Sequence, residues 1–276
     1  MFGLATAVFF ASSSLAASRS VRMIGPYAIV AWAMLVGMIL IIPALIISGA
    51  PAHLTGITLI WWLLSGAGNV VGLVLAAAAF KFGKVGVVAP ILATEGALAA
   101  TISAILGESI APIAAFVLLV IVGGVVLAAI GPDPEPLKDE RPLLAATFAA
   151  CAALGFGISL YAVGHLSSEI PIAWNLLPAR AIGVLALTLP LFLMRRLPMT
   201  RKALPLVILS GVAEVVGFTC YTIGAQYGVA VTAVLASQFA PISAIMAYVL
   251  FKERLGKVQI AGVVIIVVSV ITLTLI

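Results

Sequence analysis

The nine residues Leu64-Ser-Gly-Ala-Gly-Asn-Val-Val-Gly72 recur as Leu209-Ser-Gly-Val-Ala-Glu-Val-Val-Gly217, with six identities at an offset of 145 residues. A single offset that also aligns glycine, proline and glutamate elsewhere in the chain is hard to obtain by chance from low-complexity apolar sequence. We therefore interpret the chain as an internal duplication. The further pairs at this offset are Gly83 with Gly228, Glu108 with Glu253, and Pro26 with Pro171.

The composition around this repeat is that of a membrane protein. Of 276 residues, 64% are hydrophobic and 8% are charged, whereas globular chains average about 45–50% apolar and about 25% charged residues. These values exclude a soluble enzyme, a nucleic-acid-binding protein and a disulfide scaffold, and the continuous apolar runs argue against a β-barrel. Cys151 and Cys220 lie inside apolar runs, so we expect neither a disulfide nor a metal site.

Ten apolar runs are long enough to cross a bilayer at roughly 20 residues per helix. The first run is not a signal peptide, because Arg19 and Arg22 follow it instead of preceding it. The expected spans are 1–18, 26–48, 57–80, 85–106, 111–130, 143–164, 171–193, 203–224, 229–250 and 257–275.

Basic residues mark one end of these spans. Thirteen of the 14 lie in the odd-numbered connections, and the even-numbered connections and both termini carry none. Because Lys and Arg are retained on the cytoplasmic side, we expect the odd-numbered connections in the cytoplasm and both termini outside. The thirteen are Arg19, Arg22, Lys81, Lys84, Lys138, Arg141, Arg195, Arg196, Arg201, Lys202, Lys252, Arg254 and Lys257.

The segment 131–142 divides the chain into two halves. It is the only long polar stretch, with four prolines, four acidic and two basic residues. We expect a cytoplasmic linker here, between a five-helix repeat at 1–130 and a second at 143–276. Because five is odd, the second repeat enters the membrane from the opposite face. The expected fold is an all-α membrane protein of ten transmembrane helices in two inverted-topology repeats, an architecture of secondary transporters with a midplane binding site.

The chain resembles the EamA family of the drug/metabolite transporter superfamily over nearly its whole length. The resemblance rests on the two five-span halves, on Glu253-Arg254 after span nine and on Gln259-Ile-Ala-Gly-Val-Val-Ile-Ile-Val-Val-Ser in the last span, with Gly107-Glu108 and Gly123-Gly124 as counterparts in the first half. It implies an exporter of amino acids, other metabolites or drugs, driven by a proton gradient or by exchange. Many members of the family keep both termini in the cytoplasm, whereas the loop charges here place them outside.

Three ionisable residues lie within the expected spans, where a charge costs roughly 2.5–3.5 kcal/mol and points to function. Glu95, Arg180 and Glu214 are each about 14–17 Å from a span end at 1.5 Å per residue. Glu214 belongs to a helical stripe in span eight, and its counterpart in span three is Asn69. We expect these two small-and-polar faces to meet across the pseudo-axis. The stripes are Ser210, Glu214, Gly217 and Tyr221, and Ser65, Asn69, Gly72 and Ala76.

The charges suggest alternative roles. Glu95 has apolar neighbours on its helix face, so burial disfavours its charged form; it is either a proton carrier, neutral when buried and ionised when wetted, or a structural group. Arg180 either neutralises a glutamate, structurally or functionally, or grips a substrate carboxylate. With all three groups charged the site has a net charge of −1, which suits a cation or a zwitterion.

Prolines and aromatic residues complete the candidate site. Pro178 and Pro241 free the carbonyls of Trp174 and Ser237, about four residues earlier. Substrate contacts are expected from Asn69 and Gln238 and from aromatic residues that can wall a cavity, with packing or interfacial anchoring as the alternative for each aromatic. The aromatic candidates are Trp174, Tyr221, Tyr248 and Trp32. His53 and His165 are expected to be solvated loop residues.

These patterns predict a secondary active transporter, not an enzyme, that moves a small amphipathic, amino-acid-like metabolite by alternating access. The cavity is expected between spans three, four, seven, eight and nine. A multidrug exporter of lipophilic cations is the alternative, favoured if Glu95 and Glu214 both face the cavity and Arg180 points elsewhere. From other classes, an intramembrane lipid-modifying enzyme lacks a nucleophile or metal site, and a structural membrane partner has no use for three midplane charges. The expected partners are the bilayer, a small-molecule substrate and protons, with no cofactor, metal, ATP or nucleic acid; the substrate, direction of transport and oligomeric state stay open.

Overall fold

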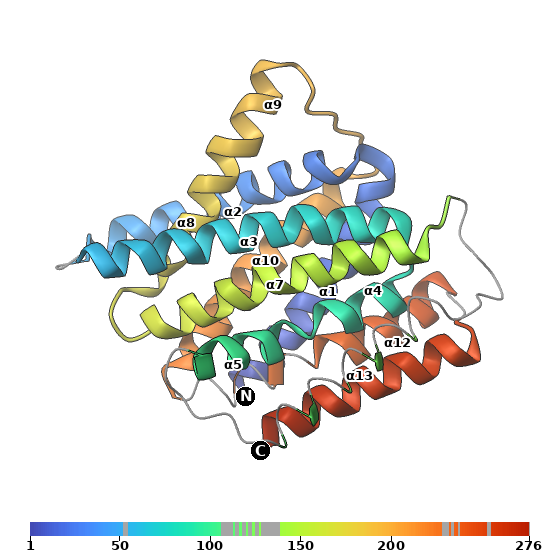
Figure 1. The fold of residues 1–276 in the computed structure, drawn as a ribbon. Helices are drawn as coiled ribbons and strands as arrows, with labels where there is room; N and C mark the ends of the chain where they lie inside the picture. Colours follow the sequence, from blue (N-terminus) through green and yellow to red (C-terminus); the bar gives the residue numbers. More distant parts are fainter. Residues whose placement is uncertain are drawn as a thin grey trace.

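The computed structural model describes residues 1–51, 55–105, 113, 116–117, 120, 123–124, 127, 139–227, 232, 235–236, 238–252 and 255–275, and its elements there are all helices (Figure 1). They are α1 (Phe2–Ile24), α2 (Pro26–Ser48), α3 (Gly56–Phe82), α4 (Val85–Leu92), α5 (Glu95–Ile105), α7 (Pro142–Leu166), α8 (Ile172–Gly183), the π-helical segment η1 (Val184–Thr188), α9 (Leu189–Leu193), α10 (Leu204–Ala225), α12 (Phe239–Phe251) and α13 (Lys257–Leu275).

Among the described residues, five helices are long and apolar enough to cross a membrane: α2, α3, α7, the composite Ile172–Leu193, and α10. Shorter apolar helices cover Val85–Ala99, Ile242–Phe251 and Lys257–Ser269. The all-helical, multi-pass class predicted from the sequence is therefore confirmed. Most of the expected fifth span and linker, and also His53, Glu108, Ser237 and the Glu253-Arg254 pair, lie outside the described residues.

The first helix is longer than expected. It runs to Ile24, not to residue 18, and ends at Gly25, whose φ of 85° turns the chain into α2. Arg22 does not stop the helix, because its long side chain reaches back to the end of α3 and donates hydrogen bonds to the carbonyls of Phe80 and Gly83, at 3.4 and 3.1 Å.

Several odd-numbered connections meet at one end of the bundle. Besides the contact of Arg22 with the end of α3, the Arg141 amide donates to the Phe82 carbonyl at 2.9 Å. The Arg19 guanidinium lies 3.8 Å from the ring centroid of Phe251 at the end of α12. Connections one, three, five and nine are thus neighbours, as alternating spans require.

The expected continuous helix 85–106 is wrong, because the chain breaks between α4 and α5. The hydroxyl and the amide of Thr94 both bond to the carbonyl of Ile91, at 2.7 and 3.2 Å, and this local bond competes with the regular helix pattern. Glu95 consequently begins a new helix. At the corresponding place in the second half, Gln238 precedes the start of α12.

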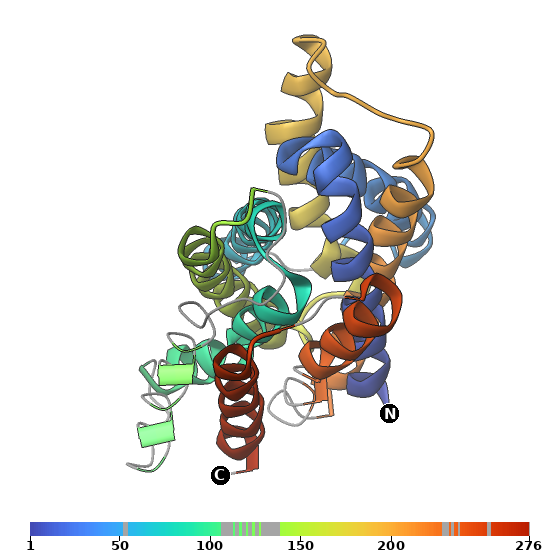
Figure 2. The ribbon, with the colours of Figure 1, turned by 90° about the vertical axis from the view of Figure 1, so that its right-hand side faces the viewer.

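The seventh span is also irregular. A π-helical segment, η1, joins α8 to α9, and α9 with the chain that follows it stands away from the other helices (Figures 1 and 2). No residue of α9 is buried. π-helical turns inside α-helices are rare and occur frequently at functional sites, and here the turn follows Arg180 by four residues.

The helix pairings repeat when the two halves are exchanged. The most extensive pairings are α3 with α7 and α1 with α10, so the first helix of each half packs on the third helix of the other. The pairs α2 with α10 and α3 with α8 are likewise related, as are α1 with α12 and α5 with α7. The expectation that α3 and α10 meet is therefore wrong: they make marginal contact at most, because α1 and α7 take the faces that α3 and α10 were expected to share.

Candidate functional site

Two glycine–phenylalanine contacts set the distance between the halves. A Cβ on Gly72 of α3 would lie 2.6 Å from Cδ1 of Phe156 of α7, and one on Gly217 of α10 would lie 2.7 Å from Cδ1 of Phe10 of α1. Neither position has room for a side chain. These glycines serve close packing, the role that small residues have in membrane helix interfaces.

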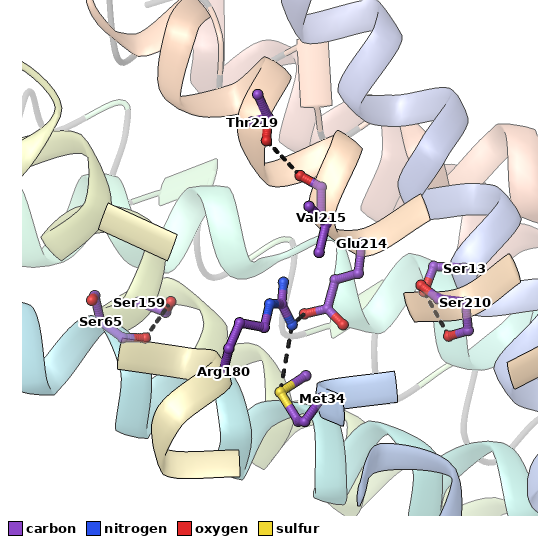
Figure 3. A network of polar contacts seen from close by, with 9 residues as sticks. All are labelled: Ser13, Met34, Ser65, Ser159, Arg180, Ser210, Glu214, Val215 and Thr219. Atoms are coloured by element: carbon purple, nitrogen blue, oxygen red, sulfur yellow. Dashed lines mark hydrogen bonds and ion pairs between the residues drawn. The ribbon is translucent and has the colours of Figure 1, made fainter. Parts of the chain in front are cut away.

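Two serines, each three residues after one of these phenylalanines, also make contacts between the halves (Figure 3). The Ser159 hydroxyl donates to the Ser65 carbonyl at 2.8 Å. The Ser13 hydroxyl lies 3.3 Å from the Ser210 carbonyl and 3.0 Å from the Ser210 hydroxyl. Because Ser65 and Ser210 are the repeated serines of the duplication, the same contact is made twice.

A cavity lies between these inter-repeat contacts. Its empty volume, including the open mouth, is about 750 Å³. The lining is apolar and aromatic except for three serines and two carboxyl groups. It consists of Phe10, Ser13, Ser14, Ala17, Ile29, Val30, Ala33, Leu73, Ala76, Ala77, Phe80, Leu92, Glu95, Phe156, Leu160, Ser210, Glu214, Phe218 and Phe239.

The two carboxyl groups come from opposite halves of the chain. Glu95 is placed on the cavity wall by the break before α5, and Glu214 by the middle of α10. Both are buried, at 6% and 3% exposure. Within the described part of the chain, no basic side chain forms an ion pair with Glu95. A cavity lined by aromatic side chains and two carboxyl groups attracts positive charge, since phenyl faces also favour cations.

Arg180 lies behind Glu214 and not in the cavity (Figure 3). Its Nη1 is 3.2 Å from Oε1 of Glu214, with both side chains buried. The same Nη1 donates to Sδ of Met34 at 3.4 Å. The pair lacks hydrogen-bond geometry: among the described residues neither carboxylate oxygen has a hydrogen-bond partner, nor does Arg180 Nε. Of the roles expected for Arg180, this arrangement is neutralisation of a glutamate.

A second, smaller pocket lies on the Arg180 side of the site. Its empty volume is about 230 Å³. The expected site residue Asn69 lies here, 2% exposed, and not in the main cavity. The lining consists of Ser65, Asn69, Ser159, Val163, Asn175, Leu176, Ala179, Arg180 and Phe218.

Trp174 behaves as the proline argument predicts. Its carbonyl, which Pro178 leaves without a helix donor, accepts a hydrogen bond from the Trp62 indole at 2.6 Å. The freed carbonyl thus joins α8 to α3 and is not left for a substrate.

The remaining expected residues are dispersed. Tyr221 is fully buried beside the cavity residue Phe218, with ring centroids 6.5 Å apart. Gln238 stands at the start of α12, whose next residue, Phe239, lines the cavity. Tyr248 is 64% exposed on the far side of α12, and the structure does not bring it to the others. Trp32 donates to the Pro198 carbonyl at 3.2 Å, outside the cavity.

Spans one, two and six line the cavity, which was not expected from the sequence, whereas span seven, which was expected there, does not. A signal was available in the sequence. Phe10-x-x-Ser13 matches Phe156-x-x-Ser159 at an offset of 146, one residue more than the offset of the other spans. An ungapped comparison at 145 does not find it.

Comparisons with known proteins agree on the family and on the fold. A model of the EamA-like transporter family matches residues 1–130 and 143–275. No curated protein matches this chain. Among 27 matching chains of solved structures, one crystal structure aligns over 98% of this chain and 93% of its own, with a TM-score of 0.66 at 15% identity. That likeness concerns the fold alone.

Proposed function

This chain belongs to the EamA-like transporter family, and from this premise we propose that it is a secondary active transporter for small amphipathic organic cations. The family resemblance found in the sequence is confirmed. The substrate class is our inference, and one observation carries it: Glu95 and Glu214 line one aromatic cavity, whereas the only cation near them, among the described residues, is turned to the back of Glu214.

The balance of charge favours a cation over a zwitterion. An amino-acid-like substrate, as first expected, requires a positive group for its carboxylate. Arg180 is already paired with Glu214 and does not line the cavity. A protonated amine or a quaternary ammonium group needs only a carboxylate and phenyl faces, which the cavity supplies.

Protons are the proposed counter-substrate. Glu95 is buried without a described basic partner, so it loses little by being neutral in the dry state and can ionise when the cavity is wetted. Exchange of a proton for a cation at a shared pair of carboxyl groups keeps the cavity charge constant in both directions. This supports coupled exchange, in which the two repeats rock about the cavity by alternating access.

The proposed orientation follows from the basic connections. Connections one, three, five and nine lie at one end, and the positive-inside rule puts that end in the cytoplasm. Both termini then lie outside, and the second repeat is inverted relative to the first.

A thermal-stabilisation screen of the purified protein tests the substrate class. Phenethylamine and phenylalanine form a matched pair, because they differ only in the carboxylate. We expect phenethylamine and tetraphenylphosphonium to raise Tm and phenylalanine not to do so. The shift should disappear in Glu214→Gln and persist in Glu169→Gln, since Glu169 is exposed in a connection. Stabilisation by phenylalanine above that by phenethylamine would favour the zwitterion instead.

A further inference from the structure

Arg180 stands between two different polar environments. On one side is Glu214, in the wall of the main cavity, and on the other is the smaller pocket with Asn69 and Asn175 (Figure 3 shows the Glu214 side). Asn69 occupies in α3 the position that Glu214 occupies in α10, 145 residues later. The guanidinium therefore lies between a carboxylate and the neutral counterpart of that carboxylate.

The smaller pocket contains hydrogen-bond acceptors that have no partner among the described residues. The Oδ1 atoms of Asn69 and Asn175 are buried and have no hydrogen-bond partner among the described residues. The orientation of the Asn175 amide is set by its Nδ2, which donates to the Val163 carbonyl at 3.1 Å. Buried acceptors without donors are costly, so a donor group is well suited to this pocket.

Arg180 has a hydrogen-bond donor without a partner among the described residues. A guanidinium carries five N–H groups, and Nε has no partner in the described part of the chain. The described contacts of Nη1 are the ion pair with Glu214, which lacks hydrogen-bond geometry, and the weak acceptor Met34. Arg180, which has an unused donor, thus lines the same pocket as the two asparagines with unused acceptors.

The helix around Arg180 is irregular on both sides of the arginine. Pro178 precedes the arginine by two residues, and η1 begins four residues after it. Opposite the side chain is Gly37, where a Cβ would lie 2.8 Å from Cδ of Arg180. The arginine stem therefore packs against the backbone of α2, in space that a side chain at position 37 would occupy.

We propose that the pocket of Asn69 and Asn175 is a second binding position for the Arg180 guanidinium, which we call the second seat. When an organic cation binds beside Glu214 in the main cavity, the guanidinium moves from Glu214 to the second seat. This rests on the proposed function. A second cation beside Glu214 repels the guanidinium, and arginine cannot respond by losing its proton. The amide oxygens accept it without a net charge, so they hold it more weakly than Glu214 does, and it returns when the cation leaves. Arg180 is then a tethered competitor that sets the affinity for cations.

Binding of tetraphenylphosphonium to the full-length protein in detergent tests the second seat. Arg180→Gln removes the competitor and should tighten binding about tenfold, within the usual range of coupling between sites. Asn69→Leu removes an acceptor of the second seat with a side chain of the same branching and should weaken binding severalfold. The decisive variant combines them: with Arg180→Gln in place, Asn69→Leu should have no further effect.

Asn69→Asp keeps Arg180 and Glu214 intact and provides a second test of the second seat if Arg180→Gln does not fold. An added carboxylate draws the guanidinium into the second seat and should tighten cation binding. If the wild type binds the cation and neither Arg180→Gln nor Asn69→Asp binds it more tightly, the second seat is contradicted, but the proposed cation transport is not. The second seat is also contradicted if Asn69→Leu weakens cation binding equally in the wild type and in the Arg180→Gln variant. If neither the wild type nor any variant binds tetraphenylphosphonium, the proposed function itself is wrong.

Discussion

Asn69 and Glu214 occupy corresponding positions in the two halves, and both side chains are buried, but only Glu214 is paired with an arginine and only Glu214 lines the main cavity. The duplication therefore supplies a symmetric scaffold, while single substitutions on it supply the chemistry. A carboxylate in one half and a neutral amide at the corresponding position of the other make the site chemically asymmetric.

The close inter-repeat packing predicts that Gly72→Ala destabilises the protein. The new methyl group would lie 2.6 Å from the Phe156 ring, and overpacking of this kind costs about 1–3 kcal/mol. Unfolding in detergent titrations measures the loss. Gly56→Ala is the matched control, because a Cβ there meets nothing within 4 Å. Equal stability of the two variants would contradict the packing described.

The buried pair predicts a strong dependence of stability on both partners. Arg180→Met leaves the Glu214 carboxylate without its cation and should cost about 3–5 kcal/mol. Arg180→Met combined with Glu214→Leu removes both charges and should recover most of that loss. Double-mutant unfolding measurements give the coupling; purely additive losses would mean that the two groups do not interact.

The bond between Trp62 and the freed Trp174 carbonyl predicts an interaction with Pro178. Trp62→Phe removes the donor and should cost about 1–3 kcal/mol, because it leaves the carbonyl unsatisfied. With Pro178→Ala, the restored backbone amide bonds to the same carbonyl, and Trp62→Phe should then cost less. A loss of the same size in both backgrounds would show that the indole stabilises the protein in another way.

The proposed orientation predicts which connections face the cytoplasm. In a variant without Cys151 and Cys220, a cysteine at the exposed position Lys81 should resist a membrane-impermeant maleimide in intact cells and react after permeabilisation. A reporter fused after the last span should be active only outside the cytoplasm. A fusion active only inside would reverse the orientation and leave the helix packing unaffected.

The outline of this molecule could be predicted from the sequence because duplication and hydropathy are properties of whole segments. The three ionisable residues expected inside the spans, Glu95, Arg180 and Glu214, stand in long apolar runs, and the structure buries all three side chains. The partner of Arg180 was left open, because spacing along helices does not say which helices are neighbours.

The helix bounds and helix neighbours that were predicted wrongly depend on individual side-chain contacts, which hydropathy does not describe. Thr94 ends a helix by bonding to Ile91, although the run 85–106 is mostly apolar. Arg22 remains in α1 because distant carbonyls accept its hydrogen bonds. The packing of α1 on α10 and of α7 on α3 depends on matching Phe10 and Phe156 to glycines far away in the chain.

Proton-driven uptake into proteoliposomes tests the central claim most directly. The probe is trimethyl(phenethyl)ammonium, whose charge does not change with pH, with the membrane potential clamped at zero and the lumen acidic. We expect accumulation with the wild type and with the exposed-site control Glu169→Gln, and none with Glu95→Gln or Glu214→Gln. Undiminished accumulation with both Glu95→Gln and Glu214→Gln would contradict the account, because the cavity carboxyl groups would then carry neither the proton nor the cation.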